Sequence, residues 1–130
     1  MKMSNAEMTE LYEKAHIAGI EALEAATPTA MIVGHEKGFM SGRIDYSKPT
    51  YHVAEGPCGF AWILVKPGTS RFARWLKANG LARSDSYYGG VSIWVRHGGQ
   101  SIERKEAYAR AFADVIRDAG IKSFAMSRMD

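Results

Sequence analysis

One uncharged apolar segment near the middle of the chain constrains the fold more than any other. Residues 59–65 read GFAWILV and contain no charged side chain. A continuous run this short is typical of a strand buried on both faces, because a strand with one face in water alternates polar and apolar residues. The sequence therefore predicts a sheet that has this segment in its interior.

The segments around this run predict helices and further strands. Helices are expected at residues 5–26, 71–78 and 102–119, each after a residue that can cap its first turn: Ser4, Thr69 or Ser70, and Ser101. Strands are expected at 30–33, 51–54, 91–96 and 121–126, whereas glycine and proline punctuate an irregular loop at 34–49. With residues 1–27 as an N-terminal helical segment, this order favours a single α+β domain over residues 1–130. We expect a mixed or antiparallel sheet of about four to five strands packed with three helices.

The composition is that of an ordinary globular domain. The 130 residues are 46% hydrophobic and 24% charged, which is enough for a real core. The single cysteine, Cys58, cannot form an internal disulfide, and no signal peptide or membrane span is recognisable, so we expect a cytoplasmic protein. The net charge of +3 suits an anionic partner, and a solvated surface with a small basic excess explains it equally well.

The sequence contains no recognisable motif of a catalytic or metal site. Its histidines lack the i, i+4 spacing of metal ligands and no Cys-x-x-Cys pattern is present, so we expect neither metal nor cofactor. Cys58 enters the apolar run, and we interpret it as a buried structural cysteine rather than a nucleophile. A phosphate-binding loop and a nucleophile elbow are also missing. We therefore predict a binding protein rather than an enzyme, unless the fold assembles a carboxylate site.

Aromatic and basic side chains gather between residues 83 and 110 and indicate a binding site. Aromatic rings stack on nucleobases, and arginine and lysine bind phosphate. The segment 98–101 opens a helix, and the free N–H groups of a helix start attract anions. Each residue taken singly is also explained as a core aromatic or a solvated cation. The expected ligand-binding residues are Tyr87, Tyr88, Arg96, Arg104, Lys105 and Tyr108; Phe72, Arg83, Trp94 and Arg110 belong to the same group.

Small residues follow one face of the first expected helix, among them Ala15, Gly19, Ala22 and Ala26. They are explained either by close packing on the sheet or by a seam for self-association. We expect a homo-oligomer, because a shallow surface on one chain binds a small ligand weakly and a second subunit can complete the pocket.

From residue 55 onward the chain resembles a group of small bacteriophage-encoded proteins. The resembling segments are EGPCGFAW at 55–62, YGGV at 88–91, GQSIERKEAYA at 99–109 and SRMD at 127–130. Within this group the chain is similar to the phage anti-defence proteins that inhibit Thoeris immunity by binding cyclic ADP-ribose-type signals without cleaving them. The resemblance implies an oligomeric sponge in the host-cell cytoplasm. It assigns no ligand residue to this sequence.

The leading hypothesis is capture of a small anionic nucleotide of this cyclic type near the start of the last helix. Tyr87 or Tyr88 would stack on adenine, and Arg96, Arg104 and Lys105 would hold the pyrophosphate. The alternatives are a nucleic-acid-binding module that uses the basic face of the last helix, and a protein-binding inhibitor of a host defence component. No membrane partner is expected.

Overall fold

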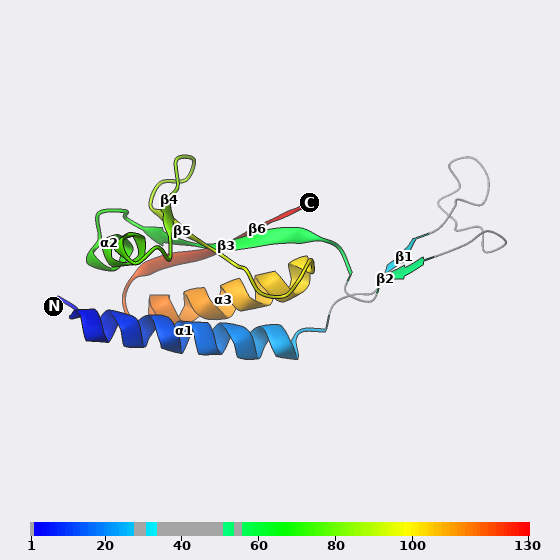
Figure 1. Cartoon of the computed structure of the whole chain (residues 1–130), viewed down its shortest axis with the longest axis horizontal. Helices are drawn as coiled ribbons and strands as arrows, with labels where there is room; N and C mark the ends of the chain where they lie inside the picture. Colours follow the sequence, from blue (N-terminus) through cyan, green and yellow to red (C-terminus); the bar gives the residue numbers. More distant parts are fainter. Residues whose placement is uncertain (1, 28–30, 34–50, 54–55) are drawn as a thin grey trace.

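The structure is a computed structural model that describes residues 2–27, 31–33, 51–53 and 56–130. Helix α3 packs against one face of a sheet, and α1 lies along α3 (Figure 1). The expected loop at 34–49 lies outside the described residues. The elements in chain order are α1 (Asn5–Ala25), β1 (Met31–Val33), β2 (Tyr51–Val53), β3 (Gly59–Lys66), α2 (Arg71–Ala78), β4 (Arg83–Ser84), β5 (Val91–Trp94), α3 (Ile102–Asp118) and β6 (Lys122–Met129).

The main sheet has four strands in the order β4-β5-β3-β6, and every neighbouring pair is antiparallel. From β3 onward the chain runs strand, helix, strand, strand, helix, strand, which with this strand order is the split βαβ arrangement of ferredoxin-like folds. β1 and β2 form a separate antiparallel pair. The expected α+β class is confirmed, with an antiparallel sheet and three helices among the described residues.

The three helices begin where the sequence predicts. Ser4 and Glu7 form the expected capping box, in which each side chain accepts a hydrogen bond from the other's backbone N–H. Ser70 accepts from the N–H of Ala73, and Ser101 accepts from the N–H of Arg104. Because each serine satisfies a free N–H of the first turn, the helix starts can be predicted from local sequence alone.

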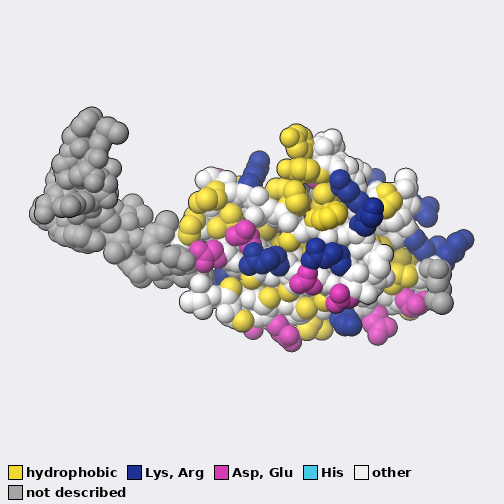
Figure 2. Space-filling view, turned by 180° about the vertical axis from the view of Figure 1, so that it is seen from behind, with side chains coloured by type: hydrophobic (Ala, Val, Ile, Leu, Met, Phe, Trp, Pro, Cys, Tyr) yellow, Lys and Arg dark blue, Asp and Glu magenta, His cyan; other side chains and the backbone are white. Residues whose placement is uncertain are grey.

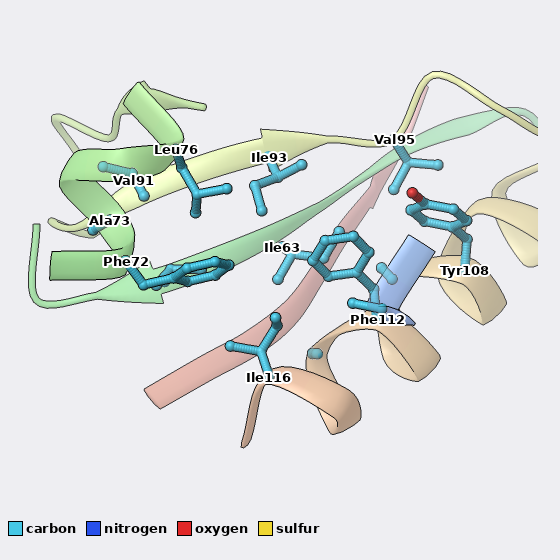
Figure 3. Close-up of a cluster of buried hydrophobic side chains, with 14 of the residues drawn as sticks. Ile63, Phe72, Ala73, Leu76, Val91, Ile93, Val95, Tyr108, Phe112 and Ile116 are labelled. Carbon is cyan, nitrogen blue, oxygen red and sulfur yellow. The ribbon is translucent and has the colours of Figure 1, made fainter. Parts of the chain in front are cut away.

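β3 is the central strand that the apolar run predicts, since it pairs with β5 on one side and β6 on the other. Its residues Ala61, Ile63 and Val65 are fully buried beneath the helices. Phe112 and Ile116 of α3 point toward Ile63 (Figure 3). The core is therefore a layer between the sheet and α3, with α2 covering one end (Figure 3).

Two of the small residues of α1 pack closely, but Gly19 packs against α3, whereas the close-packing alternative places these residues on the sheet. Ala15 and Gly19 are buried. A Cβ atom at Gly19 would lie 2.6 Å from Cδ2 of Tyr108, so only glycine lets the tyrosine ring approach this closely. Packing explains these two positions. The self-association seam and the homo-oligomer remain predictions.

The interpretation of Cys58 as a buried residue is wrong. The structure places Cys58 in an exposed position just before β3. Successive side chains of an extended chain point to opposite faces, and Gly59 faces Ile102 of α3, where an added Cβ would meet its Cδ1 at 2.6 Å. Cys58 therefore lies on the side away from the helix.

Candidate functional site

The face of the sheet opposite α1 and α3 is rich in aromatic side chains. Along β5, Val91 and Ile93 are buried toward the helices, whereas Trp94 is 42% exposed. Along β3, Phe60 and Trp62 alternate with the core residues, and Trp62 lies directly opposite Trp94 in the register. Period-two alternation thus brings aromatic rings of the two central strands together on the face opposite the helices, where Trp94 is exposed and Trp62 is buried.

These rings contact one another closely. The centroids of Trp62 and Trp94 are 5.0 Å apart with an interplanar angle of 28°, which is a stacked arrangement. Phe60 meets Trp94 edge to face at 6.1 Å. The guanidinium of Arg128 lies 5.4 Å from the Phe60 centroid and the Nζ of Lys105 lies 5.5 Å from it, so cations flank the aromatic row.

The loop between β4 and β5 projects from this face, away from α1 and α3 (Figure 1). Asp85 organises it: its Oδ1 accepts from the backbone N–H groups of Tyr87 and Tyr88, and its Oδ2 accepts from the Ser92 hydroxyl at 2.7 Å. The hydrogen bond from Tyr88, followed by that from Ser92, lowers the pKa of the Asp85 carboxyl. Tyr87 and Tyr88 are thereby presented to solvent, at 84% and 42% exposure.

Between this loop and the sheet lies a hollow of about 400 Å³, which we name the aromatic hollow. Its volume falls within the range of about 300–1,000 Å³ that is typical of small-molecule sites. Hydrophobic side chains gather around the projection at the top of the molecule, with lysine and arginine side chains beside them (Figure 2). The lining residues are Trp62, Asp85, Tyr87, Tyr88, Trp94, Ser127 and Arg128.

A second hollow of about 310 Å³ shares Trp94 with the first, and we name it the cationic hollow. Arg83 of β4 and Arg96 after β5 both line it, and no carboxylate does. Neither arginine has an ion-pair partner in the described part of the chain. Two guanidinium groups around one hollow, with no carboxylate among its lining residues, favour an anion, and their geometry suits phosphate. The other lining residues are Gly80, Leu81, Ala82 and Ser92.

The structure does not bring the six predicted ligand residues into one site, although Arg96 and Tyr108 line a common small hollow of about 110 Å³. Tyr87 and Tyr88 line the aromatic hollow, and Arg96 lines the cationic hollow. Arg104 instead donates from Nη1 to the carbonyls of Leu23 and Ala26 at the end of α1.

Two of the predicted ligand residues are buried. Lys105 is 8% exposed and donates to the carbonyl of Gly59, and Tyr108 lies in the core beside Phe112. At the start of α3, where the nucleotide pocket was expected, Arg104 and Lys105 therefore form hydrogen bonds within the fold. The aromatic hollow and the cationic hollow lie over the sheet and not at this helix start.

Comparison with protein-family models, with curated proteins and with solved structures gave no match for this chain. The resemblance to phage anti-defence proteins therefore remains a prediction.

Among the described residues no group of three or more His, Cys, Asp and Glu side chains is placed to hold a metal ion. His35 and the side chain of His52 fall outside that search, so the expected lack of a metal also remains a prediction. In the same part of the chain, none of the helices combines the length and the apolar character needed to cross a membrane.

His16, His97 and Tyr108 form a cluster where α1 and α3 meet the chain after β5. Nδ1 of His16 lies 2.6 Å from the Tyr108 hydroxyl, and the His16 and His97 ring centroids are 5.2 Å apart. Burial, and then the nearby His97, lower the pKa of His16, whereas burial and then Tyr12 raise the pKa of Tyr108. His16 is thus neutral and Tyr108 protonated at neutral pH, and the tautomer of His16 sets which of the two side chains donates this hydrogen bond.

This cluster predicts a pH dependence of stability. Because the pKa of His16 is below 6.5 in the folded chain, the unfolded chain binds more protons between the folded pKa and 6.5. The free energy of unfolding should therefore fall as the pH drops through that window, and His16→Gln should reduce the change. Urea unfolding of both proteins at about pH 7.5 and about pH 5.5 measures this difference. The same pH dependence in the variant would contradict the assignment to His16.

Proposed function

We propose that this chain binds a small anionic nucleotide, with the base in the aromatic hollow and the phosphate in the cationic hollow. The observation that supports this most directly is the position of Trp94, which lines both the hollow with stacking side chains and the hollow with two arginines that have no ion-pair partner among the described residues. A nucleotide has the matching division into a flat aromatic ring and an anionic group.

We further propose that the ligand is captured rather than converted. The two hollows present side chains that stack and that hold anions. The one carboxylate in them, Asp85, already accepts three hydrogen bonds from its own loop. Cyclic ADP-ribose-type signals are the ligands implied by the resemblance to phage anti-defence sponges, and adenine with a pyrophosphate fits the two-part site. Sequestration in an oligomer is the form of function that the same resemblance suggests.

A release experiment tests both parts of this proposal. The protein is incubated with cyclic ADP-ribose isomers, ADP and cyclic oligonucleotides, separated from free ligand, denatured by heat, and the released compounds are identified by chromatography. We expect at least one nucleotide to be retained and then released intact. A panel recovered entirely in the unbound fraction would refute binding, and a cleaved product would show an enzyme.

Single-stranded nucleic acid is a second candidate, and the aromatic row favours it. Phe60 and Trp94 lie beside the buried Trp62 on the face of the central strands opposite the helices, and four-stranded sheets stack successive bases on such rings in RNA-recognition domains. Binding over several phosphates predicts affinity that falls steeply with salt, whereas a mononucleotide gives a shallow dependence. Titration of a short oligonucleotide and of ADP at three salt concentrations separates the two.

Replacing Trp94 by alanine should weaken nucleotide binding by about 1–2 kcal/mol, or roughly 5- to 30-fold, because one stacking surface is lost. Phe124→Ala is the matched control: Phe124 is 43% exposed, close to the 42% of Trp94, but it lines neither hollow. Isothermal titration of the wild type and both variants with the retained nucleotide gives the comparison. Equal losses in the two variants would place the ligand elsewhere.

A further inference from the structure

Trp62 has a hydrogen-bond donor that the fold does not use. Its side chain is 8% exposed, and its indole N–H is the buried side-chain polar group without a partner in the described part of the chain. An indole N–H can only donate, and leaving it unpaired in the interior lowers stability. A phenylalanine would fill much of the same space without that cost, so the donor calls for a partner that the described residues do not supply.

The donor belongs to a residue at the centre of the proposed base site. Trp62 lies opposite Trp94 on one neighbouring strand and opposite Met126 on the other. It also lines the aromatic hollow. A planar ligand in this hollow therefore reaches both indoles, the exposed ring of Trp94 and the buried ring of Trp62.

Two of the neighbouring polar side chains of the hollow already have hydrogen-bond partners. Both carboxylate oxygens of Asp85 accept hydrogen bonds from the loop, and the Ser127 hydroxyl donates to Glu106 at 2.8 Å. Arg128 lies over the Phe60 ring. Trp62 is thus a residue of this hollow whose buried donor has no hydrogen-bond partner in the described part of the chain.

We infer that the indole N–H of Trp62 donates a hydrogen bond to an acceptor on the edge of the bound base. This inference rests on the proposed function and deepens it by specifying the ligand class. The base must present a ring nitrogen or a carbonyl oxygen toward β3. Stacking on Trp94 accepts any base, because every base has a π face, whereas the Trp62 donor discriminates among base edges.

Indole resonances in a ¹⁵N-correlated NMR spectrum test this directly. The chain has three tryptophans, so three indole N–H signals are expected, and Trp→Phe variants assign them. The probe is ADP. Trp94 reports stacking, Trp62 reports the proposed hydrogen bond by a downfield proton shift, and Trp75, which lines neither hollow, is the internal reference.

Deaza analogues of ADP identify the acceptor atom. The 1-, 3- and 7-deaza compounds each replace one ring nitrogen by C–H and keep the stacking surface. One of them should bind the wild type roughly 2- to 10-fold more weakly than ADP, the range expected for a neutral hydrogen bond. The same analogue and ADP should bind Trp62→Phe equally.

The outcomes separate this inference from the proposed function. A Trp94 shift without a Trp62 shift, together with equal affinities for all three analogues, overturns the role of Trp62 and leaves nucleotide binding intact. A Trp62 signal that is already downfield without ADP and does not move indicates a bound water and also overturns it. An unmoved Trp94 signal contradicts the proposed function and this inference with it.

Discussion

Replacing both Arg83 and Arg96 by glutamine is expected to weaken nucleotide binding by about 3 kcal/mol, or roughly a hundredfold. Each arginine lines the cationic hollow and has no ion-pair partner among the described residues. A hydrogen bond to a charged group contributes about 1.5–3 kcal/mol, and the lower end applies because both side chains are exposed. Isothermal titration at constant ionic strength measures the loss.

The matched control removes the same charge from elsewhere on the surface. Arg74 and Arg110 are also exposed, and neither lines the cationic or the aromatic hollow. The double variant Arg74→Gln and Arg110→Gln should keep most of the wild-type affinity. If the two double variants lose affinity equally, the protein attracts anions through its net charge and the cationic hollow is not the phosphate site.

Phe112→Ala is expected to lower the free energy of unfolding by about 3–5 kcal/mol. Phe112 is fully buried between α3 and the sheet and meets Tyr12 edge to face at 5.5 Å. Truncating it removes apolar contacts and leaves a cavity that the packed layers cannot fill. Since domains have only about 5–15 kcal/mol of stability, this is a large share.

Urea unfolding followed by circular dichroism measures this loss, and Ile17→Ala is its control. Ile17 lies on α1 and is 58% exposed, so its truncation should change stability by no more than about 0.5 kcal/mol. A loss below about 1 kcal/mol for Phe112→Ala would mean that the core between α3 and β3 is not packed as described.

The sequence predicted correctly those features that depend on interactions between residues close together in the chain. The helix starts at Ser4, Ser70 and Ser101 follow from hydrogen bonds within one turn, and the 71–78 helix has the predicted bounds. β4 was missed because it has only two residues, both exposed, and has no apolar pattern of its own. It forms through pairing with β5, a contact that no local signal specifies.

The candidate site was predicted only in part, because side-chain direction depends on tertiary contacts. Lys105 resembles a surface cation in the sequence, yet α3 turns it inward to the carbonyl of Gly59. Arg104 reaches the end of α1, which is about eighty residues away in sequence. Trp62 was placed in a buried strand, and only its pairing with Trp94 reveals a shared aromatic face. The alternation of Phe60 and Trp62 with Ala61 and Ile63 was the signal that could have indicated it.

The sequence by itself determined the class of fold, the buried central strand and the presence of stacking and cationic groups between residues 83 and 110. Hydrophobic periodicity and helix capping act over a few residues, so they can be read from the chain directly. The tertiary structure decided which of those groups share a site. The pairing of β3 with β5 places Trp94 in the lining of both the aromatic and the cationic hollow. Arg104, Lys105 and Tyr108 line neither of these hollows, because they contact other parts of the fold. Such contacts join segments that are distant in sequence, so they form only when the whole chain folds.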